Sequence, residues 1–251
     1  MEVAQNPVIK VRDLDMGYDD FIVMRDLNFD VKKGDIFIVM GTSGCGKSTL
    51  LKVLVGLLEP VKGEVLFEGK NFWDDYIEQQ LIMRRFGVLY QGGALWSSLT
   101  LEENIALPLQ LYTSLTVGQI KDVVALKLAL VGLEGYQDFY PSEISGGMRK
   151  RAGLARAIAL DPEVIFFDEP SAGLDPISAR LLDDLILEIR DVLGATIVVV
   201  THELASIFAV GSNSIFLDAE SKTMIAQGAP KDLLADSKDS RVIQFLTRGK
   251  K

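Results

Sequence analysis

Residues 41–49 read GTSGCGKST, and this stretch decides how the chain folds. Its glycines allow the backbone to wrap so tightly that successive N–H groups point at one spot, where Lys47 adds a positive charge and Ser48 a hydroxyl. The apolar run IFIVM before the loop predicts a buried strand, and the apolar spacing after Lys47 predicts a helix. A loop that joins a strand to a helix N-terminus favours an anion, so we predict a cradle for nucleotide phosphates. The alternative is a glycine-rich turn that holds no ligand. The residues of the predicted cradle are Gly41, Thr42, Ser43, Gly44, Cys45, Gly46, Lys47, Ser48 and Thr49.

The composition narrows the class of protein. The chain has 251 residues, of which 48% are hydrophobic, so it can bury a sizeable core as one large domain or as a domain with a subdomain. No apolar run reaches the length of about 18 residues that crosses a bilayer, and the first residues do not resemble a signal peptide. We therefore expect a cytosolic chain whose membrane role comes through a partner.

The net charge of −9 disfavours general binding to nucleic acid. A single cysteine, Cys45, and a single histidine, His202, exclude an intramolecular disulfide and a His/Cys zinc cluster, and Cys45 is interpreted as a small filler.

Strands alternate with helices along most of the chain, which predicts a largely parallel sheet. Alternating apolar residues over 8–35 predict two antiparallel strands ahead of the first buried strand. Apolar residues spaced by three and four over 101–131 predict a helical subdomain. Further strands are predicted to begin at Gly63, Phe86, Val164 and Thr196. One further helix is predicted to begin after its N-cap Ser145, and another is predicted to end at Gly194. A hairpin and a short helix are expected near the C-terminal end.

Two adjacent acids follow the strand that begins at Val164. Four apolar residues carry Asp168 to the end of that strand, where a magnesium ion bound to a triphosphate would need a carboxylate. Adjacent residues at a strand end diverge, so Asp168 is the predicted metal ligand and Glu169 the predicted general base for an attacking water. A solvated Asp-Glu loop is the alternative.

His202 also stands at the end of an apolar strand. In a parallel sheet, the carboxyl ends of the strands converge on the crevice where a ligand binds. His202 is therefore expected at the same edge as Lys47 and Asp168, where it would sense the terminal phosphate through a hydrogen bond. A structural histidine is the alternative.

With these features in this order, the segment ISGGMRKR over residues 144–151 resembles the signature motif of the ABC-type ATPases, usually written LSGGQ. Nearly the whole chain resembles a nucleotide-binding subunit of an ABC transporter. The resemblance implies an α/β fold: a P-loop core with a mostly parallel sheet, an N-terminal antiparallel β-subdomain and a helical signature-motif subdomain. It implies a single ABC ATPase domain over 1–251, with the core and β-subdomain at about 1–91 and 160–251 and the helical subdomain at about 92–159. The matched signature positions are Ser145, Gly146, Gly147 and Met148, the last where glutamine is common.

The resemblance also assigns roles to residues outside the cradle. Tyr18 matches the aromatic ring that stacks on adenine, with an exposed turn tyrosine as the alternative. Gln91 matches the Q-loop glutamine, which contacts the metal or the attacking water and links the core to the helical subdomain. Asp175 matches the D-loop residue that communicates across a dimer, and His202 matches the H-loop switch. ATP and Mg²⁺ are the implied cofactors, with Ser48, Gln91 and Asp168 near the metal.

Ser145 and the two glycines after it form a second anion site at a helix start. In the resembled family, each ATP lies between the P-loop of one subunit and the signature motif of the other, in a head-to-tail homodimer. The predicted mechanism is ATP hydrolysis: Lys47 neutralises the phosphates, Glu169 polarises water, and dimer closure drives a membrane permease. Residues 91–109 are the expected permease contact.

Within this family, the segment over 145–179 and a methionine at position 148 are similar to the ATPases of Mla and MCE-associated systems, which move phospholipid or other lipids. This similarity implies integral-membrane permease subunits, a periplasmic MCE-type lipid-binding subunit, and a place on the cytoplasmic face of the inner membrane. Alternatives are an ABC importer or exporter ATPase for another substrate, a soluble ABC ATPase that acts on DNA or ribosomes, and a regulatory ATP-binding module with little turnover.

Overall fold

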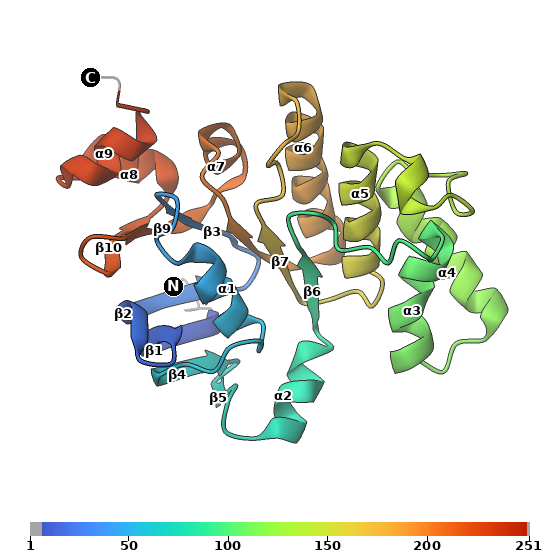
Figure 1. The fold of residues 1–251 in the computed structure, drawn as a ribbon, viewed down its shortest axis with the longest axis horizontal. Helices are drawn as coiled ribbons and strands as arrows, with labels where there is room; N and C mark the ends of the chain where they lie inside the picture. The colour runs from blue at the N-terminus through green and yellow to red at the C-terminus, as the bar shows by residue number, and fades with distance from the viewer. Residues whose placement is uncertain (1–6, 250–251) are drawn as a thin grey trace, which may run out of the picture. The chain divides into compact units, whose positions relative to one another are not determined.

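The computed structural model describes residues 7–249. The chain divides into two compact units, Met1–Met83 with Thr196–Lys251 (unit 1) and Arg84–Ala195 (unit 2). Figure 1 labels the elements of both units. Among the described residues, no helix combines the length and the apolar character that crossing a membrane requires.

The first sheet of unit 1 is antiparallel and four-stranded, in the order β2-β1-β4-β5. The first two strands are antiparallel, as the alternating pattern predicted, and Tyr18 pairs with Phe21 across a two-residue turn. Its strands are β1 (Pro7–Tyr18), β2 (Phe21–Lys32), β4 (Lys62–Phe67) and β5 (Lys70–Asn71).

The second set of strands in unit 1 has the order β10-β9-β3-β8. β3 pairs in parallel with both β8 and β9, and β10 closes the predicted hairpin by pairing antiparallel with β9. All residues of β3 and β8 are buried, which explains their continuous apolar sequences. The strands are β3 (Ile36–Gly41), β8 (Thr196–Val200), β9 (Asn213–Asp218) and β10 (Thr223–Gly228). The helices of unit 1 are α1 (Lys47–Leu54), α2 (Tyr76–Met83), α7 (Leu204–Val210), α8 (Pro230–Asp236) and α9 (Ser240–Leu246).

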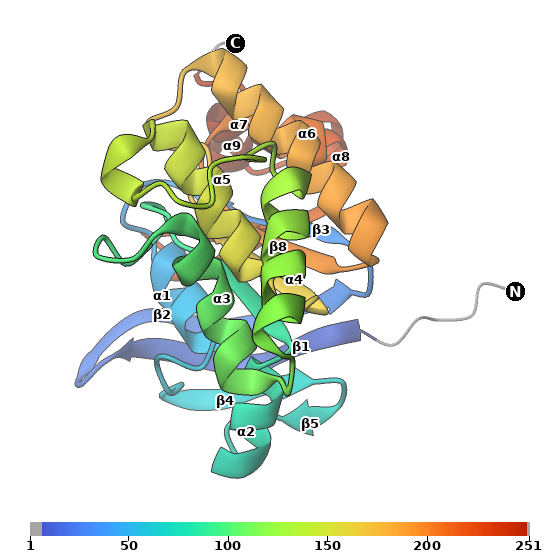
Figure 2. The ribbon, with the colours of Figure 1, turned by 90° about the vertical axis from the view of Figure 1, so that its right-hand side faces the viewer.

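Unit 2 combines a parallel strand pair with a group of helices. β6 (Phe86–Leu89) pairs in parallel with β7 (Val164–Asp168). The long helices begin at side-chain caps, which are Thr100, Thr116, Ser145 and Asp175 in chain order. Figure 2 shows α3 and α4 beside each other. The helical segments are α3 (Leu101–Tyr112), α4 (Val117–Leu130), the 3₁₀ turn η1 (Pro141–Glu143), α5 (Gly146–Ala157) and α6 (Pro176–Leu193).

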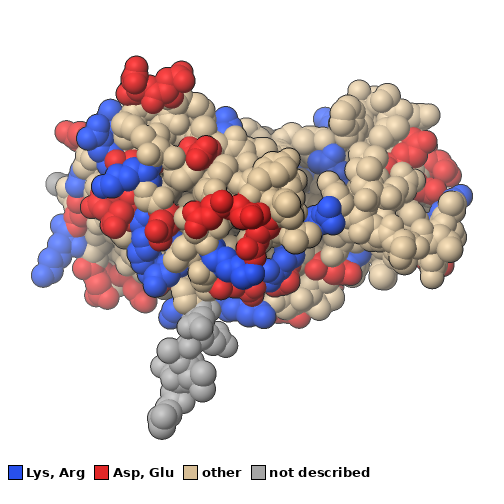
Figure 3. All heavy atoms as spheres, turned by 90° about the horizontal axis from the view of Figure 1, so that it is seen from below, with Lys and Arg blue, Asp and Glu red and all other residues tan. Residues whose placement is uncertain are grey.

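The surface carries charges of both signs. Figure 3 shows Lys and Arg side chains interspersed with Asp and Glu on one face of the molecule. The excess of acidic residues in the sequence is thus spread among basic ones on this face rather than segregated from them.

Candidate functional site

The loop between β3 and α1 has a backbone that only glycine permits at two positions. Gly41 has φ +151°, and a Cβ there would lie 2.4 Å from the carbonyl oxygen of Leu217. Gly46 has φ +95°, and its Cβ would lie 2.7 Å from Cγ1 of Val23. Gly46 is also the N-cap of α1, and because glycine has no side chain, the N-cap residue itself does not cover the positive end of this helix.

Lys47 places its ammonium inside this loop. The side chain is buried, and Nζ donates hydrogen bonds of 3.0 Å to the carbonyl oxygens of Gly41 and Thr42. A tight glycine-bounded loop, an uncapped helix start and an ammonium group are the features that a triphosphate requires. The residues present therefore fit the phosphates of a nucleotide.

Cys45 completes the same loop as a buried residue. Its side chain is 1% exposed, and burial raises the pKa of the thiol above its ordinary value. A raised pKa keeps the thiol protonated and unreactive, in keeping with its interpretation as a filler.

Tyr18 lies at the end of β1 and is attached to the helix that leaves the loop. Lys52 of α1 donates a hydrogen bond of 3.2 Å from Nζ to the Tyr18 hydroxyl, and the ammonium lies 5.5 Å from the ring centroid. Hydrogen bonds from Thr49 and Lys52 lower the pKa of Tyr18. The ring, 42% exposed, is thereby held beside α1 with surface left for a ligand.

His202 is brought to the mouth of the loop. It lines a cavity of about 330 Å³ together with Gly41, Thr42 and Ser43, as its place after β8 predicted. The rest of the lining was not predicted from the sequence, because it comes from the start of α7, from the C-terminal helix α9 and from the residues after it. These further lining residues are Leu204, Gln244, Phe245 and Arg248.

In unit 2, the predicted acids stand where β7 ends. Asp168 is the last residue of the strand, and Glu169 follows with φ +48°, in the left-handed region that non-glycine residues rarely adopt. The turn that follows is closed by a backbone hydrogen bond of 3.2 Å from the Ala172 N–H to the Glu169 carbonyl oxygen. The strand end therefore carries the Asp168 carboxylate, and a tightly bent turn carries the Glu169 carboxylate.

The segment after Gln91 packs against α5. Arg156 donates hydrogen bonds of 2.7 Å to the carbonyl oxygen of Ala94 and 3.3 Å to that of Gly93. A Cβ on Gly153 would lie 2.7 Å from the Gly93 oxygen, so the two backbones are in close contact. The predicted Q-loop is thus fixed to the helix that the signature motif begins.

The signature motif forms the first turn of α5. Ser145 caps the helix by accepting a 3.2 Å hydrogen bond from the Met148 N–H, as predicted. Asp175 caps α6 in the same way, accepting 3.0 Å hydrogen bonds from the N–H groups of Ile177 and Ser178. Its side chain is therefore engaged within its own chain.

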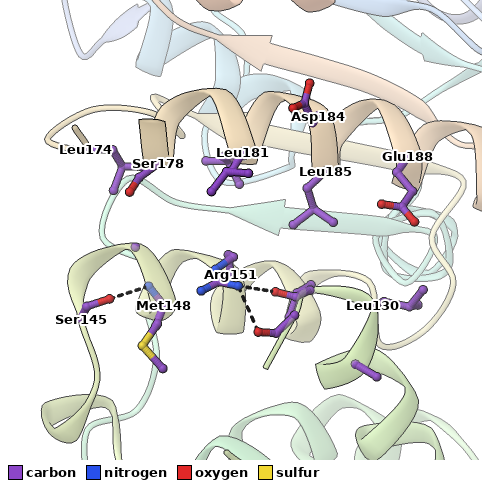
Figure 4. Close-up of a pocket in the computed structure, with 15 residues that line it drawn as sticks. Leu130, Ser145, Met148, Arg151, Leu174, Ser178, Leu181, Asp184, Leu185 and Glu188 are labelled. Carbon is purple, nitrogen blue, oxygen red and sulfur yellow. Dashed lines mark hydrogen bonds between the residues drawn. The ribbon is translucent and has the colours of Figure 1, made fainter. Parts of the chain in front are cut away.

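A cavity of about 530 Å³ lies beside this motif, between α5, the end of α4 and α6. In Figure 4, Leu181 and Leu185 point from α6 toward the gap, whereas Asp184 points away from it. Arg151 spans the floor, where Nη1 donates to the carbonyl oxygens of Val131 at 2.9 Å and Gly132 at 3.1 Å.

Comparison with known proteins identifies the family. The family model described as ABC transporter matches residues 24–172. The chain belongs to the ABC transporter family. It is an ABC ATPase, which couples ATP hydrolysis to transport.

Two curated ABC relatives have similar degrees of identity. The chain is 41% identical to the intermembrane phospholipid transport system ATP-binding protein MlaF of Haemophilus influenzae, over 95% of this chain and 90% of that protein. It is 40% identical to a probable ribonucleotide transport ATP-binding protein, mkl, of Mycobacterium leprae, over 95% of this chain and 68% of that protein.

Solved ABC structures confirm the predicted fold class. cbiO1 of Clostridium perfringens, part of the ABC transporter complex cbiONQ, has a TM-score of 0.84 at 27% identity and covers 97% of both chains. A dimeric ATP-binding cassette in a post-hydrolysis state, bound to ADP and phosphate, has a TM-score of 0.80 at 27% identity, over 88% of this chain and 98% of that one. The fold is the α/β fold of ABC ATPases, with an antiparallel N-terminal sheet and a mostly parallel main sheet.

The predicted ABC site residues fall into two groups. Unit 1 holds the phosphate loop with Tyr18 and His202. Unit 2 holds Gln91, the signature motif, the two acids at the end of β7 and Asp175, whose loops adjoin α5 and α6. Among the described residues, no group of three or more His, Cys, Asp or Glu side chains could hold a metal ion. Any Mg²⁺ here would take few protein ligands and more from phosphate and water, as Mg²⁺ commonly does.

Proposed function

We propose that this ABC ATPase powers the transport of phospholipid between bacterial membranes. The observation that carries the proposal is the 41% identity to MlaF, which extends over nearly the full length of both chains. The methionine in the signature motif, Met148, supports the same subgroup.

The proposed chemistry assigns one task to each group of the site. Lys47 neutralises the β and γ phosphates, and Tyr18 stacks on adenine. Glu169 acts as general base toward water, while His202 and Gln91 sense the terminal phosphate and the attacking water. Ser48, Asp168 and Gln91 would hold Mg²⁺, which would supply charge neutralisation at the phosphates.

The proposed working form is a homodimer. A dimeric cassette is among the similar solved structures, and the capped start of α5 offers a second anion site distinct from the phosphate loop. We place Ser145, Gly146, Gly147 and Met148 against the ATP of the partner subunit, with Asp175 as the residue that communicates between subunits. The helical segment over 92–159, which contains α3, α4 and α5, serves as a subdomain of one ABC ATPase domain.

The proposed partners are integral-membrane permease subunits and a periplasmic MCE-type lipid-binding subunit. The similarity to a cassette of an ABC transporter complex and to MlaF supports a permease partner. The chain would then sit on the cytoplasmic face of the inner membrane. The surface formed by residues 91–109 is the proposed contact.

A ribonucleotide transporter is the second candidate, because mkl is 40% identical over a similar length of this chain. A transport assay decides between phospholipid and ribonucleotide. For this assay, the tagged chain is isolated with its permease and reconstituted in proteoliposomes. We expect ATP-dependent transfer of a fluorescent phospholipid and no ATP-dependent movement of a radiolabelled ribonucleotide. The opposite pattern would replace phospholipid by ribonucleotide as the substrate.

Glu169→Gln is the matched inactive control. Loss of a general base lowers turnover by roughly two to four orders of magnitude, while ATP binding stays nearly unchanged. Near-normal hydrolysis in this variant would remove Glu169 from the role of base.

A further inference from the structure

Lys150 is a buried lysine of α5 that reaches the loop after β7. Its side chain is 7% exposed. Nζ donates two short hydrogen bonds, of 2.6 Å to the carbonyl oxygen of Pro170 and 2.5 Å to that of Ala172. The ammonium therefore holds two backbone positions, one on each side of Ser171.

The loop that Lys150 holds has a backbone that does not form easily by itself. Glu169, directly before Pro170, has φ +48°, a conformation disfavoured for residues with a Cβ. Ser171 is 4% exposed, and its hydroxyl has no hydrogen-bond partner among the described residues. Strained and partly unsatisfied segments persist where their surroundings fix them. The two bonds from Lys150 supply such a constraint.

The charge of Lys150 lies near the Glu169 carboxylate. Burial lowers the pKa of the Lys150 ammonium, and the negative charge of Glu169 opposes that shift. A buried ammonium is costly unless hydrogen-bonded and paired. Here its bonds go to the backbone of the loop that carries Glu169, so the energy of these bonds favours one conformation of that loop.

We propose that Lys150 is a positioning residue that holds the Glu169 loop in the geometry required for hydrolysis and links it to the signature helix. The proposal rests on the proposed function, in which Glu169 is the general base. Lys150 lies five residues after Ser145 on the same helix, so a displacement of α5 carries its ammonium and the bonded carbonyls together. Contact at the signature motif is thereby transmitted to the base of the same chain.

Lys150→Met tests the proposal, because methionine keeps an unbranched side chain of similar volume and removes the donors and the charge. We expect kcat to fall on the order of 10- to 100-fold, the cost of misplacing a reacting group, with KM for ATP changed by less than about twofold. Lys150→Arg retains donors and should recover part of the loss. Wild-type kcat in Lys150→Met would overturn the proposal.

Lys127→Met is the matched control for removing a buried lysine. Lys127 is also buried in unit 2, but its ammonium pairs with Asp161 at 2.5 Å rather than with the Glu169 loop. We expect its kcat to stay within about twofold of wild type, because no reacting group moves. An equal loss of kcat in both lysine variants would show a general effect of buried charge removal and would overturn the proposal.

A double variant separates positioning from general stability. When Glu169→Gln has already removed the base, adding Lys150→Met should lower the residual single-turnover rate no further. A second drop of the same size as in the wild-type background would overturn the proposal. If Lys150→Met does not fold, Lys150→Gln replaces it, because the shorter amide cannot reach both carbonyls and should give the same split between kcat and KM.

Normal hydrolysis in Glu169→Gln would refute the proposed base itself. An inactive Glu169→Gln beside a fully active Lys150→Met would refute only the positioning role.

Discussion

Replacing Gly153 by alanine tests the close contact between α5 and the segment that follows Gln91. Alanine is better than glycine inside a helix by about 1 kcal/mol, so local propensity alone predicts a more stable protein. The structure predicts the opposite sign. The added Cβ would lie 2.7 Å from the Gly93 carbonyl oxygen and 2.9 Å from both Cα of Gly93 and Cδ1 of Leu89. Two of these three atoms are backbone and cannot turn aside.

The size of the change in the free energy of unfolding depends on which atoms the added Cβ displaces. Overpacking a well-packed site typically costs about 1–3 kcal/mol. Shifting residues 93 and 94 also weakens their hydrogen bonds from Arg156, at a cost of about 1 kcal/mol. After the gain in helix propensity is deducted, the free energy of unfolding should fall by about 1–3 kcal/mol. ATPase activity should fall as well, because Gln91 lies two residues from the displaced glycine.

Gly118→Ala is the control, since Gly118 lies in α4, is exposed, and a Cβ added there would meet no atom within 4 Å. It should raise the free energy of unfolding by about 0.5–1 kcal/mol and leave hydrolysis unchanged. Urea unfolding followed by circular dichroism measures the free energy of unfolding of both variants. The slope of this free energy against urea concentration should be the same in both variants and the wild type. If Gly153→Ala is as stabilising as Gly118→Ala, the contact between α5 and Gly93 is not tight, and the reasoning fails.

Two further predictions concern the dimer and the C-terminal helix. Mixing Lys47→Ala subunits with Ser145→Arg subunits should restore ATPase activity that neither variant has alone. If each site combines the P-loop of one chain with the signature motif of the other, the mixed dimer contains one intact site. Mixed dimers that form but show no recovery of activity would contradict shared sites. Hydrogen bonds from Arg241 lower the pKa of Asp239, the N-cap of α9, to about 2. Because this folded-state pKa lies below the unfolded value of about 3.9, the ionised carboxylate stabilises the fold above that value, and the stabilisation disappears as the pH falls through about 2. Asp239→Asn keeps a capping side chain, so its urea midpoint should lie below wild type at pH 6 and approach it near pH 2; a difference that grows on acidification would contradict this sign.

The sequence predicted the elements whose apolar pattern agrees with their burial. β3 and β8 are wholly buried, and their continuous apolar runs were identified as strands. α5 begins after its predicted N-cap Ser145, which accepts a hydrogen bond from an N–H group of the first turn, and α6 ends at the predicted Gly194. Local chemistry was sufficient for these elements.

α2 was not predicted, because its pattern is inverted. Tyr76, Ile77 and Leu81 are more than half exposed, while Gln79 is buried beside Ile82. A helix whose polar residue faces inward and whose apolar residues face outward gives no amphipathic signal. α7 was missed for another reason, since its seven residues are too few to show a helical period.

Within the site, residues that act through local geometry were predicted and those that act at a distance were not. The glycines of the phosphate loop and the strand-end acids are visible in the sequence. Lys150 and Arg156 are not, because a basic residue in a helical sequence usually lies on a solvated face. Lys150 reaches a backbone carbonyl 20 residues away in sequence and Arg156 reaches one 62 residues away, through contacts that only the tertiary structure creates.

These long contacts explain how one helix can connect three loops. Ser145 begins α5, Lys150 holds the loop after β7, and Arg156 holds the segment after Gln91. Each residue turns an α-helix by 100° about its axis, so Lys150 and Arg156 point in directions about 120° apart. They therefore hydrogen-bond to loops on different faces of the helix. Because the hydrogen bonds along the helix resist stretching, a displacement of the N-terminus of α5 also displaces the side chains of Lys150 and Arg156. In the homodimer that we propose, such a link would let Glu169 of one chain respond when the signature motif of that chain meets the ATP of the partner.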